Sequence, residues 1–111
     1  MSELIEAEIR TQLGNTFLDL GEINHAYDQI SLAIQLQEQV LDSDDPVLLT
    51  SYHNLASVKL QLGEHQEALT LLEQVEKQYE IIYGPDSGQV LDVQSDLATV
   101  LIVLRTSSVR S

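Results

Sequence analysis

The sequence repeats itself at an offset of 42 residues, and this repeat restricts the possible folds more than any other feature. Leu-Gly-Glu at 20–22 recurs at 62–64, and Leu-Ala at 55–56 recurs at 97–98. The unit therefore occurs twice, and its first half occurs a third time. Repeats of this length are typical of stacked supersecondary units, because one unit alone cannot bury its apolar face.

Each copy of the unit has the pattern of two helices. In the first half of copy one, apolar residues recur at three- and four-residue spacing at positions 5, 9, 13, 17 and 20. Gly21 then stands where a left-handed helix end favours glycine. A second apolar stripe runs from Ile23 to Leu41. It stops before Asp45-Pro46, which offers an N-cap and a first helical residue.

The same pattern continues through the rest of the chain. It predicts helices over about 46–62, from Ala68 to Ile82 before the turn at Gly84, and over about 89–105. No window alternates with period two, so we expect no strands. Short connections force neighbouring helices to be antiparallel. We therefore expect an all-α repeat domain at 1–106, with repeat one at about 4–45, repeat two at about 46–87, partial repeat three at about 88–105, and a disordered polar tail at 107–111.

The charge balance restricts the partners. The chain has 18 acidic and five basic residues, a net charge of −13. Such a chain should repel nucleic acid and anionic membranes and favour neutral or basic partners. The charge also has a simpler interpretation, as a device for solubility.

The sequence offers no sign of export or of a membrane anchor. The absence of cysteine favours a cytoplasmic location. The first residues lack the features of a signal peptide. The longest apolar run, Val100–Leu104, is too short to span a bilayer.

Residues with catalytic or ligating potential do not form a recognisable pattern. There is no cysteine nucleophile and no Gly-rich phosphate loop. His25, His53 and His65 do not form an i, i+4 pair, which a helical zinc site would need. We therefore expect no enzyme activity, no catalytic residue, no cofactor and no metal.

The recurring small and apolar residues resemble the tetratricopeptide repeat. The matching positions are Gly14, Phe17, Gly21, Ala26, Ile30 and Ala33 in copy one, Ala56, Gly63, Ala68, Leu72 and Val75 in copy two, and Leu97 and Ala98 in copy three. The 42-residue unit, with Asn54-Leu55-Ala56 and Gly84-Pro85-Asp86, is similar to the long variant in kinesin light chains. The resemblance implies a right-handed α-solenoid of about five helices that binds proteins as an adaptor or scaffold.

The resemblance also implies a concave face formed by the first helix of each pair. Its lining would be Glu8, Thr11, Gln12, Asn15, Asp19, Thr50, His53, Asn54, Ser57, Gln61, Asp92, Ser95, Asp96 and Thr99. Asn15 and Asn54 match positions where the family commonly has Asn, whose amide can hydrogen-bond an extended peptide backbone. The set contains four carboxylates and no Lys or Arg, so its ligand should be a neutral or basic peptide or protein. The same residues would also suit an ordinary solvated surface.

Two departures from the family pattern complete the analysis. Lys59 stands where copy one has Phe17, so its charged end must reach solvent or the packing there must be looser. Ile102, Val103 and Leu104 point in three directions around one helix, and no later apolar segment can cover them. This favours an alternative function, in which the chain is an oligomerisation or assembly segment of a larger repeat protein that self-associates as a homodimer through its last helix. If the chain is a fragment of a longer array, the next helix would cover this face instead.

Overall fold

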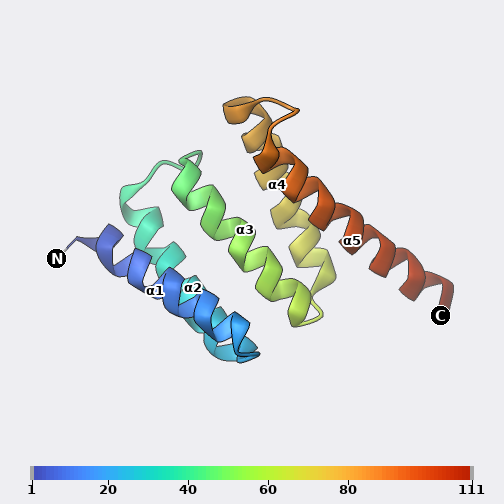
Figure 1. Ribbon diagram of the computed structural model, residues 1–111, viewed down its shortest axis with the longest axis horizontal. Helices are drawn as coiled ribbons and strands as arrows, with labels where there is room; N and C mark the ends of the chain where they lie inside the picture. Colours follow the sequence, from blue (N-terminus) through green and yellow to red (C-terminus); the bar gives the residue numbers. More distant parts are fainter. Residues whose placement is uncertain (1, 111) are drawn as a thin grey trace.

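The structure, a computed structural model, describes residues 2–110, with side chains described for residues 2–106. It contains five helices and, within the described range, no strand (Figure 1). They are α1 (Glu3–Asp19), α2 (Ile23–Val40), α3 (Pro46–Gln61), α4 (His65–Tyr83) and α5 (Gly88–Arg110). The predicted all-α fold is confirmed.

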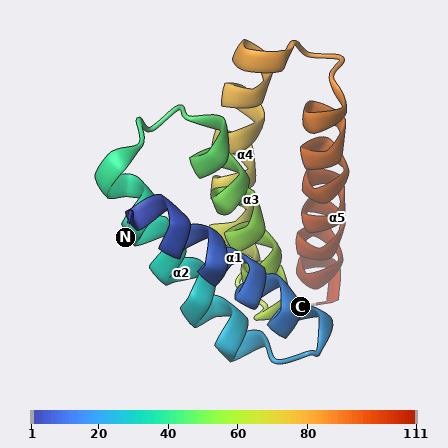
Figure 2. The same cartoon turned by 60° about the vertical axis from the view of Figure 1, so that its left-hand side comes forward.

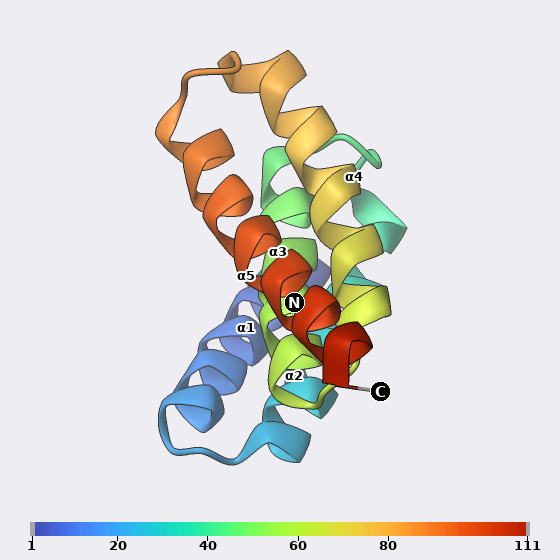
Figure 3. The ribbon, with the colours of Figure 1, turned by 90° about the vertical axis from the view of Figure 1, so that its right-hand side faces the viewer.

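The helices form two layers. Figure 3 shows α1, α3 and α5 on one side of the molecule and α2 and α4 on the other. Each helix packs chiefly on its neighbours in the sequence, so that α2 lies between α1 and α3, and α4 between α3 and α5. Figure 2 shows the same succession from a second side. The chain is therefore a short solenoid whose first-of-pair helices share one layer.

Glycine ends the first helix of both complete pairs, as the sequence predicts. Gly21 has φ 79° and Gly63 has φ 83°, both in the left-handed region. In each turn the amide after the glycine donates to a carbonyl five residues earlier, at 2.8 and 2.9 Å. These are paired Schellman-type ends, which satisfy carbonyls that a helix terminus leaves free.

Side-chain caps begin the first-of-pair helices. Asp45 Oδ1 accepts from the Val47 N–H at 2.9 Å, and Pro46 is the first residue of α3. This confirms the predicted cap. Ser87 Oγ accepts from the Val90 N–H at 3.2 Å at the start of α5.

The apolar residues of α2 to α5 meet in two core clusters, whereas four residues of the stripe predicted on α1 are exposed: Ile5, Ile9, Leu13 and Leu20. One joins α2 and α3 through Ala26, Ile30, Ile34, Leu48 and Val58. The other joins α3, α4 and α5 through Leu49, Ala56, Ala68, Leu72, Val75, Tyr79, Val90, Val93, Leu97 and Val100. The two clusters place α3 at the centre of the fold.

The last helix is longer than the sequence analysis predicts. α5 continues to Arg110 instead of ending near Arg105, so residues 107–110 are helical and not a disordered tail. Residue 111 lies outside the described residues. The chain has no Gly or Pro after Gly88 to stop the helix. Thr106 also fits within it, because its hydroxyl donates to the Ile102 carbonyl at 2.8 Å.

Candidate partner-binding groove

The residues predicted to line a concave face all lie on α1, α3 and α5, the helices of one layer (Figure 3). None of them is buried. This layer, with the fourteen residues named above, is called the groove below. Its polar side chains are therefore available to a partner, although exposure alone is also what a solvated surface would show.

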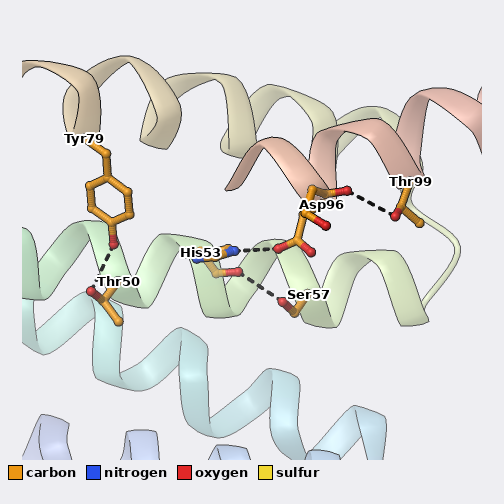
Figure 4. A network of polar contacts seen from close by, with 7 residues as sticks. Thr50, His53, Ser57, Tyr79, Asp96 and Thr99 are labelled. Atoms are coloured by element: carbon orange, nitrogen blue, oxygen red, sulfur yellow. Dashed lines mark hydrogen bonds and ion pairs between the residues drawn. The ribbon is translucent and has the colours of Figure 1, made fainter. Parts of the chain in front are cut away.

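A histidine–carboxylate pair joins α3 to α5 within the groove. His53 Nε2 and Asp96 Oδ2 are 2.6 Å apart (Figure 4). These two residues are 43 positions apart in the sequence and come from successive copies of the repeat. The contact shows that predicted groove positions of neighbouring copies face each other.

A second polar contact joins the groove to the other layer. The Thr50 hydroxyl donates to the Pro46 carbonyl at 2.9 Å and lies 3.1 Å from the Tyr79 hydroxyl (Figure 4). Because Thr50 has only one proton to give, Tyr79 is the donor in their contact. Burial raises the pKa of Tyr79 above its ordinary value, which keeps the phenol protonated.

The remaining groove hydroxyls are largely occupied within their own helices. Thr11, Ser57 and Thr99 each donate to the carbonyl four residues earlier. Asn15 and Asn54 have no side-chain hydrogen bond to another described residue. The groove therefore offers a partner free side-chain amides and carboxylates, and few free hydroxyl donors.

The groove carboxylates are not neutralised by lysine or arginine from the groove itself. Glu8, Asp19 and Asp92 are exposed, and only Asp96 has a described ion-pair partner, His53. Acidic charge on a groove favours a ligand of the opposite sign.

Lys59 is used away from the groove. Its ammonium group lies 2.8 Å from carboxylate oxygens of both Glu64 and Glu67, and 5.2 Å from the centre of the Tyr27 ring. The hydrogen bonds that the ammonium group donates to Glu64 and Glu67 raise the pKa of Lys59 above its ordinary value. Of the two outcomes expected from the sequence, the structure shows the first: the stem is covered and the charged end reaches the carboxylates.

One end of the groove contains a cavity of about 470 Å³ between α1, α2 and α3. Three predicted groove residues line it: Glu8, Thr11 and Thr50. The sequence analysis missed its other lining residues, which are Leu4, Gln37, Leu41, Asp45, Val47 and Ser51. A comparison of the copies could have indicated the cavity, because Ser51 is a small polar residue at a register that holds Ile9 in copy one and Val93 in copy three.

The residues proposed for self-association are placed unequally. Ile102 is 65% exposed, whereas Val103 is half-buried and Leu104 packs against the core cluster of α3, α4 and α5. Leu91 and Leu101, which the sequence analysis did not select, are 56% and 53% exposed. The apolar face of α5 is thus formed by Leu91, Leu101 and Ile102, and this set is called the α5 face below.

The repeat explains why the α5 face is open. The register of Leu91 and Ala98 is that of Leu49 and Ala56 in copy two, which are buried in the core with α4. In copy three the same registers lie on α5, where Leu91 and Ala98 are exposed. The 42-residue offset could have identified these positions from the sequence.

Two other classes of site find no support in the described residues. No group of three or more His, Cys, Asp or Glu side chains is placed to hold a metal ion there. None of the five helices combines the length and the apolar character that crossing a membrane requires.

Comparison with solved structures gives the same architecture. Crystal structures of nearly identical TPR-like repeats, from a Podosopora anserina protein assigned to the kinesin light chains, superpose on the chain. One, a point variant, has 24% identity and a TM-score of 0.82 over 96% of this chain and 50% of that one. Another has 25% identity and a TM-score of 0.79 over 89% of this chain and 47% of that one. The chain thus spans about half the length of these neighbours.

Sequence comparison identifies the family. A search of curated proteins gives no match. The tetratricopeptide repeat profile matches residues 5–81 and 47–102, which together cover most of the chain. The predicted resemblance, including that to kinesin light chain repeats, is therefore confirmed, and the chain belongs to the tetratricopeptide repeat family.

Proposed function

We propose that the chain is a non-enzymatic adaptor or scaffold module, located in the cytoplasm, that binds a neutral or basic segment of another protein in the groove. Repeats of this family generally mediate protein–protein interaction. The observation that carries the specific proposal is the row of exposed carboxylates on α1 and α5, without a lysine or arginine among the groove residues.

The uncommitted amides supply the second part of recognition. Asn15 on α1 and Asn54 on α3 can each donate to and accept from a peptide backbone. A backbone held in this way would be read without regard to its sequence, and the carboxylates would add the preference for positive charge.

A paired peptide experiment tests this proposal. Two peptide pools of equal length, one rich in lysine and one rich in glutamate, are titrated by fluorescence anisotropy against the whole chain. The basic pool should bind and weaken as salt rises from about 0.05 to about 0.5 M, because the screening length falls below the distances between exposed charges. The acidic pool should not bind.

Variants locate the binding surface. Asp19→Asn/Asp92→Asn should weaken binding of the basic pool about tenfold, roughly 1.4 kcal/mol, and flatten its salt dependence. The matched control, Asp28→Asn/Glu73→Gln, removes two exposed carboxylates from α2 and α4 and should bind like the parent. Tight binding of an acidic peptide that Asn15→Ala/Asn54→Ala abolishes would overturn the proposal.

A second candidate function is self-association through the α5 face. The exposure of Leu91, Leu101 and Ile102 favours it. In copy two the registers of Leu91 and Ile102 hold Leu49, which is buried in the core, and Leu60, which packs against it. This function would make the chain an assembly segment.

A further inference from the structure

We propose that the cavity between α1, α2 and α3 is a subsite for one lysine or arginine side chain of the groove ligand. This inference rests on the proposed groove function and adds the residue type that the groove selects. The cavity holds about 470 Å³ and opens among the groove residues Glu8, Thr11 and Thr50. It is therefore reached from the surface on which a peptide would lie.

The internal repeat shows why copy one has this cavity. Gln37 and Leu41 occupy the registers of Tyr79 and Tyr83 in copy two. There the Tyr79 side chain is only 4% exposed, its hydroxyl is 3.1 Å from Thr50, and its ring lies edge-on to that of Tyr83. Shorter side chains at both registers leave space in copy one that aromatic rings fill in copy two.

The lining suits a long basic side chain. Leu4, Leu41 and Val47 supply an apolar wall, which matches the methylene stem of lysine or arginine. Glu8 and Asp45 are the charged residues of the lining, and both are acidic. Glu8 is exposed and Asp45 caps α3, and neither has an ion-pair partner among the described residues, so both would attract a cationic side chain and repel an acidic one.

Gln37 adds an independent polar contact inside the cavity. This residue is only 4% exposed, and its Oε1 accepts from the Ser51 hydroxyl at 2.6 Å. Its amide nitrogen has no hydrogen-bond partner among the described residues. Every fully buried side-chain nitrogen or oxygen in that part of the chain does have a partner. The nitrogen is therefore not fully buried, and because Gln37 lines the cavity we place this donor toward the backbone carbonyl of the same ligand residue.

The direct test uses a single residue as the probe. Nα-acetyl-lysine amide is titrated into the whole chain, and amide shifts are followed by NMR. The expected result is weak, saturable binding, with shifts at Thr11, Thr50, Ser51 and the Gln37 side chain. Nα-acetyl-norleucine amide has the same stem without the charge and should bind at least about tenfold more weakly. Equal affinity for the two probes would overturn the proposal.

The repeat itself supplies the blocking variant. Gln37→Tyr should fill the cavity, as Tyr79 does in copy two, and lower affinity for the lysine probe at least about tenfold. Gln35→Tyr makes the same substitution at an exposed position of α2 that does not line the cavity, and should bind like the parent. Thermal melts establish that both variants fold. Glu8→Gln keeps the shape and should weaken only the charged probe; unchanged binding by Gln37→Tyr would overturn the subsite.

These outcomes separate the subsite from the groove function. If basic peptides bind and Gln37→Tyr has no effect on them or on the lysine probe, the groove function stands and the subsite is wrong. If the lysine probe binds in the cavity and the basic peptide pool does not bind the chain, the subsite stands and the groove function is wrong.

Discussion

Gly21 and Gly63 each hold a backbone conformation that other residues adopt at a cost. Both have positive φ, and a Cβ added to either would meet no atom within 4 Å. Their role is therefore purely conformational. The cost of a side chain here comes from the backbone itself and not from a clash.

We expect Gly21→Val and Gly63→Val each to lower the free energy of unfolding by about 1 kcal/mol or more, because a β-branched residue is strained at positive φ. Chemical denaturation monitored by circular dichroism measures this. Gly88→Ala is the control, since Gly88 also meets no atom within 4 Å but has no positive φ. It should be neutral or slightly stabilising. Variants as stable as the parent at both 21 and 63 would contradict the role assigned to these turns.

At the same residue scale, the sequence placed the predicted groove residues on one helix layer, unburied, and missed most of the residues that line the cavity. Groove positions follow from helical register and family resemblance, so they could be placed in advance. The cavity forms where a short side chain occupies a register that a larger side chain fills in another copy of the repeat. The sequence indicates this for Gln37 and Ser51 only when they are compared with Tyr79 and Val93, which occupy the same registers in the next copy. Only the structure shows that the space stays open.

At the scale of helices, Gly14 sets how closely α1 approaches α2. A Cβ at Gly14 would lie 2.6 Å from Cγ1 of Ile30, which is well inside contact distance. In copy two the same register holds Ala56, and the register of Ile30 holds Leu72, so this contact between paired helices is made by different side chains in the two copies. Packed cores respond to changes of this size.

We expect Gly14→Ala to destabilise the chain by about 1 kcal/mol, because a clash of about 1–3 kcal/mol outweighs the roughly 1 kcal/mol that alanine contributes within a helix. In the background of Ile30→Ala the clash is absent, and the same substitution should stabilise by about 1 kcal/mol. Urea unfolding of the four proteins forms a double-mutant cycle. Additive effects would show that the two helices do not meet at this pair.

Element boundaries were predictable where a residue imposes them and were missed where none does. Gly21, Gly63 and the Asp45-Pro46 pair fix three ends through φ or capping, and the structure confirms them. The end of α5 has no such residue. The prediction placed the end of this helix near Arg105. Because no residue there stops a helix, α5 continues to Arg110 in the structure.

At the scale of the whole molecule, the 42-residue offset was sufficient for the architecture. It identified two complete helix pairs and a half pair, which are α1 with α2, α3 with α4, and α5 alone. What it could not supply is the state of the open end. That depends on whether another surface covers the α5 face. Association with another molecule decides this, and the sequence pattern of one chain does not.

The magnitudes favour weak self-association through this face. Leu91, Leu101 and Ile102 are each somewhat more than half exposed. Covering what remains of three such side chains contributes roughly 1 to 1.5 kcal/mol each, or about 6 to 9 kcal/mol when two copies cover one another. The loss of translational and rotational freedom opposes this by about 4 kcal/mol or more. A dimer should therefore form only at high concentration.

We expect analytical ultracentrifugation to show a monomer at micromolar concentration and a rising average mass toward about 1 mM, as a net association energy of only a few kcal/mol requires. Leu101→Asp/Ile102→Asp should remain monomeric throughout, because a carboxylate would be buried unpaired at the contact. The matched control is Leu20→Asp/Ile81→Asp, which changes two exposed apolar residues outside the α5 face and should dimerise like the parent. A parent that stays monomeric over the whole range would sink the self-association candidate.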